Sequence, residues 1–166
     1  LYPNAIFNLF GDFNQCISEK GTSALKAIPK ELHINTPEII SENYRNARQI
    51  TDYVNQTYHM QMLPVGLAGI QKCDDSIPDL EIAPDDRVAI IVSGAPPVLN
   101  DFLCDHDAVF FDEQGEIVRG TYNVISVANV KGLEFEKAIV ILSGMTQNEQ
   151  YVACTRAITE LYVIPA

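Results

Sequence analysis

The sequence predicts an open, mostly parallel α/β sheet with helices on both faces, and three observations predict it. Apolar, β-branched runs such as "RVAIIVS" (87–93) are typical of strands in a parallel sheet that is covered on both faces. Helical segments alternate with these runs, as in folds built from right-handed crossovers. The chain has 166 residues, 47% of them hydrophobic, which suits one domain with a substantial core.

The first half of the chain holds fewer clear elements. "NAIFNLFGD" (4–12) is predicted to be a buried strand that ends in a polar loop, and "EKGTSALKAIPK" (19–30) a linker. A short strand follows, then a helical run that Thr36 caps and Pro37 opens. A turn-like break at "ENYRN" (42–46) divides this run.

The segment after the break is predicted to be an amphipathic helix, because Ala47, Ile50 and Val54 recur at helical spacing. Residues 61–86 are rich in Pro, Gly and Asp and are predicted to be an insertion or a long loop. The remaining elements are predicted as a strand at 87–93, a helix at 97–104, a strand at 108–111, a turn at 112–116, strands at 122–128 and 137–143, a helix at 148–159 and a strand at 160–166.

Composition narrows the class of protein. Eleven Lys and Arg against 22 Asp and Glu give a net charge of −11, with no basic run, so the electrostatic signature of a protein that binds nucleic acid unaided is missing. The four cysteines are dispersed without metal or redox spacing, which predicts reduced thiols, no metal site and a cytoplasmic location. No apolar run is long enough to predict a membrane span. The start at Leu1 and the stop on "YVIPA" suggest a piece of a longer protein.

Four short strings carry the polar residues that follow or separate these elements: "GDFNQ" (11–15), "NYRNARQI" (43–50), "VKGLEFE" (130–136) and "YVACTRA" (151–157). Each has a simple structural explanation. Gly-Asp can be a turn, Arg45 and Arg48 a solvated helix face, and Lys131-Gly132 an ordinary loop. Arg156 can pair with Glu160 one helical turn away. In open α/β sheets ligands bind at the carboxyl ends of strands, so such residues are also candidates for a site.

Taken together and in chain order, the strings resemble the later motifs of the UvrD/Rep-type superfamily 1 helicases, with "NYR", "KGLEF" and "YVACTRA" the most specific. The resemblance covers most of the chain and implies a RecA-like fold of the P-loop NTPase type. Residues 1–18 would be the tail of a first RecA-like domain and 19–30 a linker. Residues 31–166 would be the second, C-terminal RecA-like domain, with the family's inserted subdomain reduced to about 61–86.

The resemblance also implies roles for single residues. Arg45 and Arg156 would be cations that stabilise the charge on the γ-phosphate of ATP, as arginine fingers do. Gln15 would sense that phosphate, and Tyr44 would stack on the adenine. Glu134 would accept a hydrogen bond from the ribose hydroxyls of the nucleotide. Gly132 would let the backbone approach the nucleotide closely, because it has no Cβ. We expect Arg156 to lack a partner within this chain, because its partner is a phosphate.

The chain lacks both the phosphate-binding sequence G-x-x-x-x-G-K-[ST] and an acidic strand end for Mg²⁺. In this family both precede the "GDxxQ" string, so ATP with Mg²⁺ would be bound mainly by the N-terminal RecA-like domain of the same protein. The full-length protein is therefore expected to be an ATP-dependent DNA helicase, and this chain alone to be inactive.

Nucleic-acid contacts are expected to be weak. Where the family often has Thr-x-His, this chain has Ser126 and Ala128, so only Ser126 remains to contact single-stranded DNA. One alternative is a helicase-like ATPase that remodels a protein partner such as RNA polymerase. Another is a metabolic or flavodoxin-like domain, although no dinucleotide-type glycine turn is present and the three histidines, His33, His59 and His106, are isolated.

Overall fold

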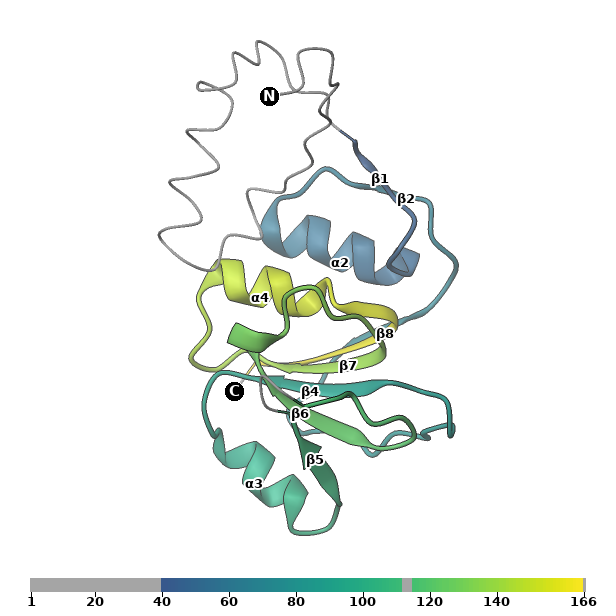
Figure 1. Cartoon of the computed structure of the whole chain (residues 1–166). Helices are drawn as coiled ribbons and strands as arrows, with labels where there is room; N and C mark the ends of the chain where they lie inside the picture. The colour runs from purple at the N-terminus through teal and green to yellow at the C-terminus, as the bar shows by residue number, and fades with distance from the viewer. Residues whose placement is uncertain (1–39, 112–114, 166) are drawn as a thin grey trace, which may run out of the picture.

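The computed structural model describes residues 40–111 and 115–165 (Figure 1). The predictions for the strand at 4–12, the linker at 19–30, the Thr36 cap and Gln15 lie outside these residues. The elements in chain order are β1 (Glu42–Asn43), α2 (Arg48–Tyr58), β2 (Leu63–Pro64), β3 (Ile70–Cys73), β4 (Val88–Val92), α3 (Pro97–Leu103), β5 (Ala108–Phe110), β6 (Tyr122–Ser126), the 3₁₀ helix η2 (Val127–Asn129), β7 (Phe135–Ile141), α4 (Gln147–Cys154) and β8 (Ala157–Ile164).

Six strands form one sheet in the order β3-β8-β7-β4-β6-β5, and every neighbouring pair is parallel. Helices α2 and α4 pack on one face and α3 on the other, which gives three layers (Figure 1). The predicted open α/β sheet with helices on both faces is confirmed.

Strand β4 lies in the middle of this sandwich, and all five of its residues are buried. Alternate side chains point to opposite faces, so Ile91 packs with α2 and α4 while Ile90 packs with α3. A strand buried on both faces needs apolar residues at every position, which explains the continuous run in the sequence.

The prediction of an insertion or long loop at 61–86 is wrong in part. Within it, β3 joins the sheet as an edge strand and pairs in parallel with β8, with Ile70 opposite Glu160. The short strand β2 pairs with β1 in a separate ribbon. Three of the four residues of β3 are exposed, so its sequence "IQKC" lacks the apolar pattern that identifies a buried strand.

The predicted helix at 148–159 ends earlier, at Cys154, and the last strand begins at Ala157 instead of residue 160. The β-branched residues of "AITELYVI" favour a strand, and this strand pairs on both sides, with β7 and with β3. Helix α4 begins with a capping box in which Thr146 and Glu149 bond reciprocally. As a result Arg156 lies in the short turn between helix and strand.

An ion pair joins the start of β7 to the residue before β4, with Arg87 Nη2 2.7 Å from Glu136 Oε1. Burial raises the pKa of Glu136, but the hydrogen bonds from Arg87 outweigh it and hold that pKa below its usual value. The pair therefore adds stability above the ordinary glutamate pKa and loses it as the pH falls through the folded-state pKa.

We expect Glu136→Gln to lower the free energy of unfolding by about 1 kcal/mol at neutral pH, because the pair is about one-third exposed. The difference from the wild-type chain should shrink between neutral pH and a pH below the folded-state pKa of Glu136, where the carboxylate is protonated. Urea denaturation at the two pH values measures this. An equal loss at both would show that the charge of Glu136 is not the cause.

Candidate functional site

The predicted site residues lie at two opposite edges of the sheet. Arg156 and Glu134 immediately precede β8 and β7, at the edge where the strands begin. Ser126 ends β6 and is paired with Val92, level with the end of β7. At about 3.3 Å per residue, the two edges are about 20 Å apart. The expectation that the candidates share the carboxyl ends of strands therefore holds for Ser126 and is wrong for the charged residues.

At the amino edge, two residues 89 positions apart in the sequence form an ion pair. Arg45 Nη1 lies 3.5 Å from Glu134 Oε1, with 37% and 41% of the two side chains exposed. A pair this long and this exposed adds little to stability. Arg45 lies before α2, so it is not part of a solvated helix face, and Arg48 donates from Nε to the carbonyl of Gly66 at 2.7 Å.

Arg156 is buried, with 3% of the residue exposed. Its Nε donates to the carbonyl of Val152 at 3.0 Å, Nη2 to Thr155 Oγ1 at 3.2 Å and Nη1 to the carbonyl of Leu133 at 3.5 Å. The expectation that Arg156 lacks a partner within this chain is wrong. These bonds supply acceptors for a desolvated guanidinium and connect the end of α4 to the crossover before β7.

The alternative pairing of Arg156 with Glu160 required a helix through both residues, and the strand β8 replaces it. Glu160 instead lies 3.8 Å from Lys137 Nζ and accepts a hydrogen bond from Tyr162 at 2.7 Å. The helical explanation of Arg156 is therefore also wrong.

Asn46 holds the two cationic segments together, and sequence reasoning missed it. This residue is 1% exposed, and its amide nitrogen donates to the carbonyls of Thr155 at 3.0 Å and Ala157 at 2.6 Å, on either side of Arg156. Its Oδ1 accepts from Asn43 Nδ2 at 2.9 Å. The sequence offered one clue to Asn46: it is a polar residue next to Arg45, and the apolar spacing that predicts the helix begins only after it.

The chain also packs closely behind Asn46. A Cβ added to Gly66 would lie 2.1 Å from the carbonyl oxygen of Asn46, a distance that no side chain can adopt. Only glycine therefore allows the segment after β2 to lie against Asn46.

The other predicted residues occupy different surroundings. Tyr44 is 70% exposed and adjoins Arg45. Gly132 has a φ of 86°, and a Cβ there would meet no atom within 4 Å, so its backbone conformation rather than a close contact within the described chain favours glycine. Ser126 caps η2 by accepting a hydrogen bond from the amide of Ala128 at 3.4 Å.

The described part of the chain offers neither a cluster of metal ligands nor a buried thiol with a lowered pKa. Residues 40–111 and 115–165 contain no group of three or more His, Cys, Asp or Glu side chains placed to hold a metal ion. Cys73, Cys104 and Cys154 are free thiols, and burial raises the pKa of Cys154 to about 12, which keeps it protonated. None of the described helices is long and apolar enough to span a membrane.

No family model and no curated protein matches this chain in sequence. Among solved structures it is similar to the C-terminal domain of a possible DNA helicase from Lactobacillus plantarum WCFS1, at 17% identity and a TM-score of 0.46 over 74% of this chain and 86% of that one. It is also similar to the PRRSV nsp10 helicase, at 13% identity and a TM-score of 0.42, over 74% of this chain and 23% of that one. Because both TM-scores are below 0.5, the residues of this chain must carry any functional assignment.

Proposed function

We propose that this chain is the C-terminal RecA-like domain of a UvrD/Rep-like, ATP-dependent DNA helicase of the cytoplasm. It would supply cationic and nucleotide-contacting side chains to an ATP site shared with an N-terminal RecA-like domain. The observation that supports this most directly is the gathering of Arg45, Glu134 and the Arg156 turn at one edge of the sheet. These residues come from three distant segments, and each lies in a string that resembles a helicase motif.

The side chains at this edge fit a nucleotide in their chemistry. A guanidinium suits phosphate oxygens, an exposed tyrosine ring suits a base, and a carboxylate accepts from ribose hydroxyls. Tyr44, Arg45 and Glu134 are each at least one-third exposed, so a ligand can reach them. ATP with Mg²⁺, held mainly by the N-terminal domain, would supply the phosphoryl group.

In this mechanism Arg45 leaves the carboxylate of Glu134 and pairs with a phosphate group of ATP. Its contact with Glu134 is long and half-solvated, so the guanidinium can turn toward a phosphate at small cost while Glu134 turns toward hydroxyl groups. Asn46 keeps the Arg45 segment against the turn that carries Arg156, so the relative positions of the two arginines are fixed. Closing and opening of the two domains would then move single-stranded DNA.

We expect Glu134→Ala to remove the preference of the full-length protein for ATP over 2′,3′-dideoxy-ATP. A hydrogen bond to a charged acceptor contributes about 1.5 to 3 kcal/mol, so the wild-type protein should bind ATP about 10- to 100-fold more tightly than the dideoxy analogue. Equilibrium binding of the two nucleotides to both proteins measures this. Glu116→Gln, at an exposed acid outside the strings that resemble helicase motifs, is the control, and an undiminished preference in Glu134→Ala would remove Glu134 from the site.

The second candidate is an ATPase that remodels a protein partner such as RNA polymerase. The observation that favours it is a set of exposed carboxylates, Asp75, Asp101 and Asp105, around one cleft on the face that α3 covers, which would repel DNA phosphates. Strand displacement by the full-length protein, with ATP hydrolysis measured in parallel, separates the two candidates. DNA-stimulated hydrolysis with strand displacement supports the helicase, whereas hydrolysis stimulated only by RNA polymerase supports the remodelling ATPase.

A further inference from the structure

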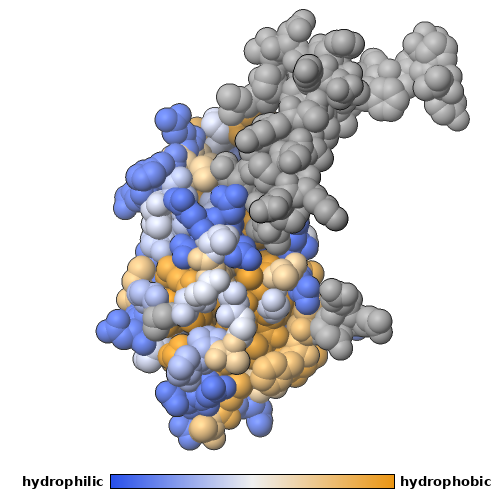
Figure 2. All heavy atoms as spheres, turned by 90° about the vertical axis from the view of Figure 1, so that its left-hand side faces the viewer, coloured by the Kyte–Doolittle hydropathy of each residue, from blue (hydrophilic) through white to orange (hydrophobic). Residues whose placement is uncertain are grey.

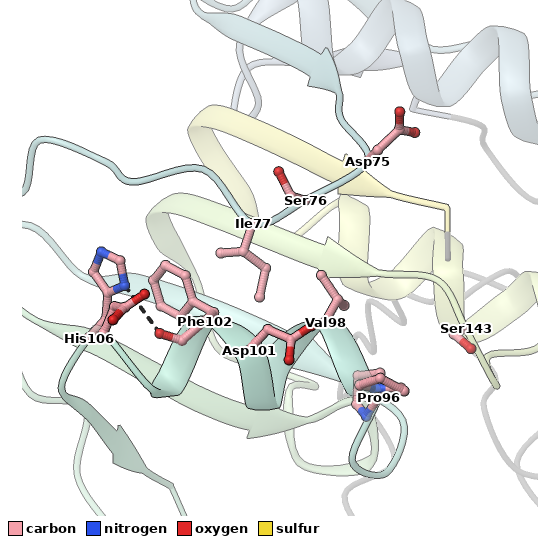
Figure 3. Close-up of a pocket in the computed structure, with 11 residues that line it drawn as sticks. Asp75, Ser76, Ile77, Pro96, Val98, Asp101, Phe102, His106 and Ser143 are labelled. Atoms are coloured by element: carbon pink, nitrogen blue, oxygen red, sulfur yellow. Dashed lines mark hydrogen bonds between the residues drawn. The ribbon is translucent and has the colours of Figure 1, made fainter.

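A cleft of about 720 Å³ lies on the face of the sheet that α3 covers, and it runs along α3 from Pro96 and Ser143 at the carboxyl edge to His106 beyond the end of the helix. Asp75 and Ser76 follow β3, Pro96 and α3 follow β4, and Ser143 follows β7, so three strands and one helix enclose it (Figure 3). Its volume is within the range of ligand-binding pockets. The cleft is distinct from the site around Arg45, because none of its lining residues belongs to that site and the residue after Asn46 packs on the other face of the sheet.

One end of the cleft, at Pro96 and Ser143, lies at the topological switch point of the sheet. Strands β4 and β7 are neighbours, but the chain leaves β4 through α3 on one face and β7 through α4 on the other (Figure 1). Connections that part in this way leave a crevice between the strand ends, where open α/β sheets bind ligands. Figure 2 shows the same edge from outside, with a broad hydrophobic area between hydrophilic groups.

The floor of the cleft is apolar and rigidly built. Ile77 and Phe102 are each 8% exposed and belong to the core on this face, and Val98 packs beside them. Figure 3 shows Ile77 pointing down toward α3 and Val98 pointing up from it. The His106 ring stacks on Phe102 with ring centroids 4.1 Å apart, and its Nδ1 donates to the Phe102 carbonyl at 3.1 Å in the tautomer protonated there. An apolar side chain of a ligand would therefore meet a preformed surface.

The rim of the cleft carries acidic side chains whose mutual repulsion is unfavourable while the cleft is empty. Asp101 is exposed in the last turn of α3 and Asp105 is exposed two residues beyond its end, so the two carboxylates repel each other and also oppose the helix dipole. Asp75 stands on the opposite wall (Figure 3). None of the eleven lining residues is lysine or arginine. A bound cation would relieve both unfavourable interactions.

We propose that this cleft binds a basic, partly apolar segment of a protein partner. A Lys or Arg side chain of that segment would lie between Asp101 and Asp105, and an adjacent aliphatic or aromatic side chain would cover Ile77 and Phe102. Charge favours this occupant over a nucleic acid, because the chain carries a net charge of −11 and the rim has only carboxylates. Asp75 adds a third carboxylate on the opposite wall, so the acidic surface is wider than a single small amine could cover and suits a peptide segment better.

The test is a titration of the 166-residue chain into a fluorescein-labelled dodecapeptide of alternating leucine and arginine, followed by fluorescence anisotropy. We expect saturable binding that Asp101→Asn with Asp105→Asn weakens at least tenfold. A dodecapeptide of alternating glycine and arginine should also bind at least tenfold more weakly, because it cannot cover the apolar floor. Asp52→Asn with Glu116→Gln is the matched control: both residues are exposed, both lie outside the cleft, and the change in net charge is the same.

Three results would overturn the proposal. One is a failure of the leucine-arginine peptide to saturate the wild-type chain. Another is equal weakening by the two double variants, which would mean attraction to net charge alone. The third is equal affinity for the two peptides, which would remove the apolar floor from the site. Thermal melting of each variant confirms that it is folded, and none of these outcomes bears on the ATP site.

Discussion

ATP turnover by the full-length protein is expected to fall by about 10³- to 10⁵-fold when Arg45 is replaced by alanine. The proposed role of Arg45 is to neutralise charge that develops on the transferred phosphoryl group, so the loss should appear in kcat more than in KM. Arg45 is a better probe of this role than Arg156. It makes one long ion pair at the surface, so its removal should leave the fold intact.

The control for this variant is Arg119→Ala. Arg119 is also exposed and also precedes a strand, but its guanidinium donates to the carbonyl of Asp85 at 2.6 Å and it lies outside the strings that resemble helicase motifs. It should turn over ATP at the wild-type rate. Turnover by Arg45→Ala within tenfold of the wild-type rate would rule out the finger role. Arg156→Ala is less informative, since the loss of its buried hydrogen bonds should lower stability together with activity.

The largest expected effect on stability is that of Asn46→Ala. The change leaves the buried carbonyls of Thr155 and Ala157 without the donor that bridges them, which should lower the free energy of unfolding by about 2 to 4 kcal/mol. Urea denaturation of the 166-residue chain measures it. Asn100→Ala, at an exposed position of α3, should change the same free energy by no more than about 0.5 kcal/mol.

The isosteric change Asn46→Asp separates lost packing from lost donors. A carboxylate would face two carbonyl oxygens in a buried site, so at neutral pH this variant should be less stable than Asn46→Ala. Burial raises the folded-state pKa of such a carboxyl above its unfolded value, so stability should return as the pH falls and the protonated group regains a donor. If Asn46→Asp keeps wild-type stability at pH 7, the two carbonyl bonds contribute little.

The sequence predicted the elements whose pattern is set by burial. The continuous apolar run of β4 and the helical spacing of Ile50 and Val54 in α2 both reflect contact with the core, and both elements are present. Strand β3 could not be predicted in the same way. It is an edge strand held by backbone pairing to β8, and backbone hydrogen bonds leave no mark on side-chain polarity.

In the candidate site too, some features could be predicted from the sequence and others, which depend on backbone hydrogen bonds, could not. The strings "NYR", "KGLEF" and "YVACTRA" identified side chains that the structure does bring near one another, namely Arg45, Glu134 and the turn at Arg156. Pattern alone could not reveal that Arg156 is buried, because its acceptors are carbonyl oxygens of the backbone and a neighbouring hydroxyl. Asn46 escaped notice for the same reason, since its two acceptors belong to residues more than 100 positions away.

Strands β4 and β7 extend from the edge that carries the Arg45–Glu134 pair to the edge where Pro96 and Ser143 line one end of the acidic cleft. Molecules held at the Arg45–Glu134 pair and in the cleft would contact different residues and could be present at the same time. Neither would act as a competitive inhibitor of the other. Any influence of one on the affinity of the other would have to be transmitted through the central strands of the sheet, which are largely buried.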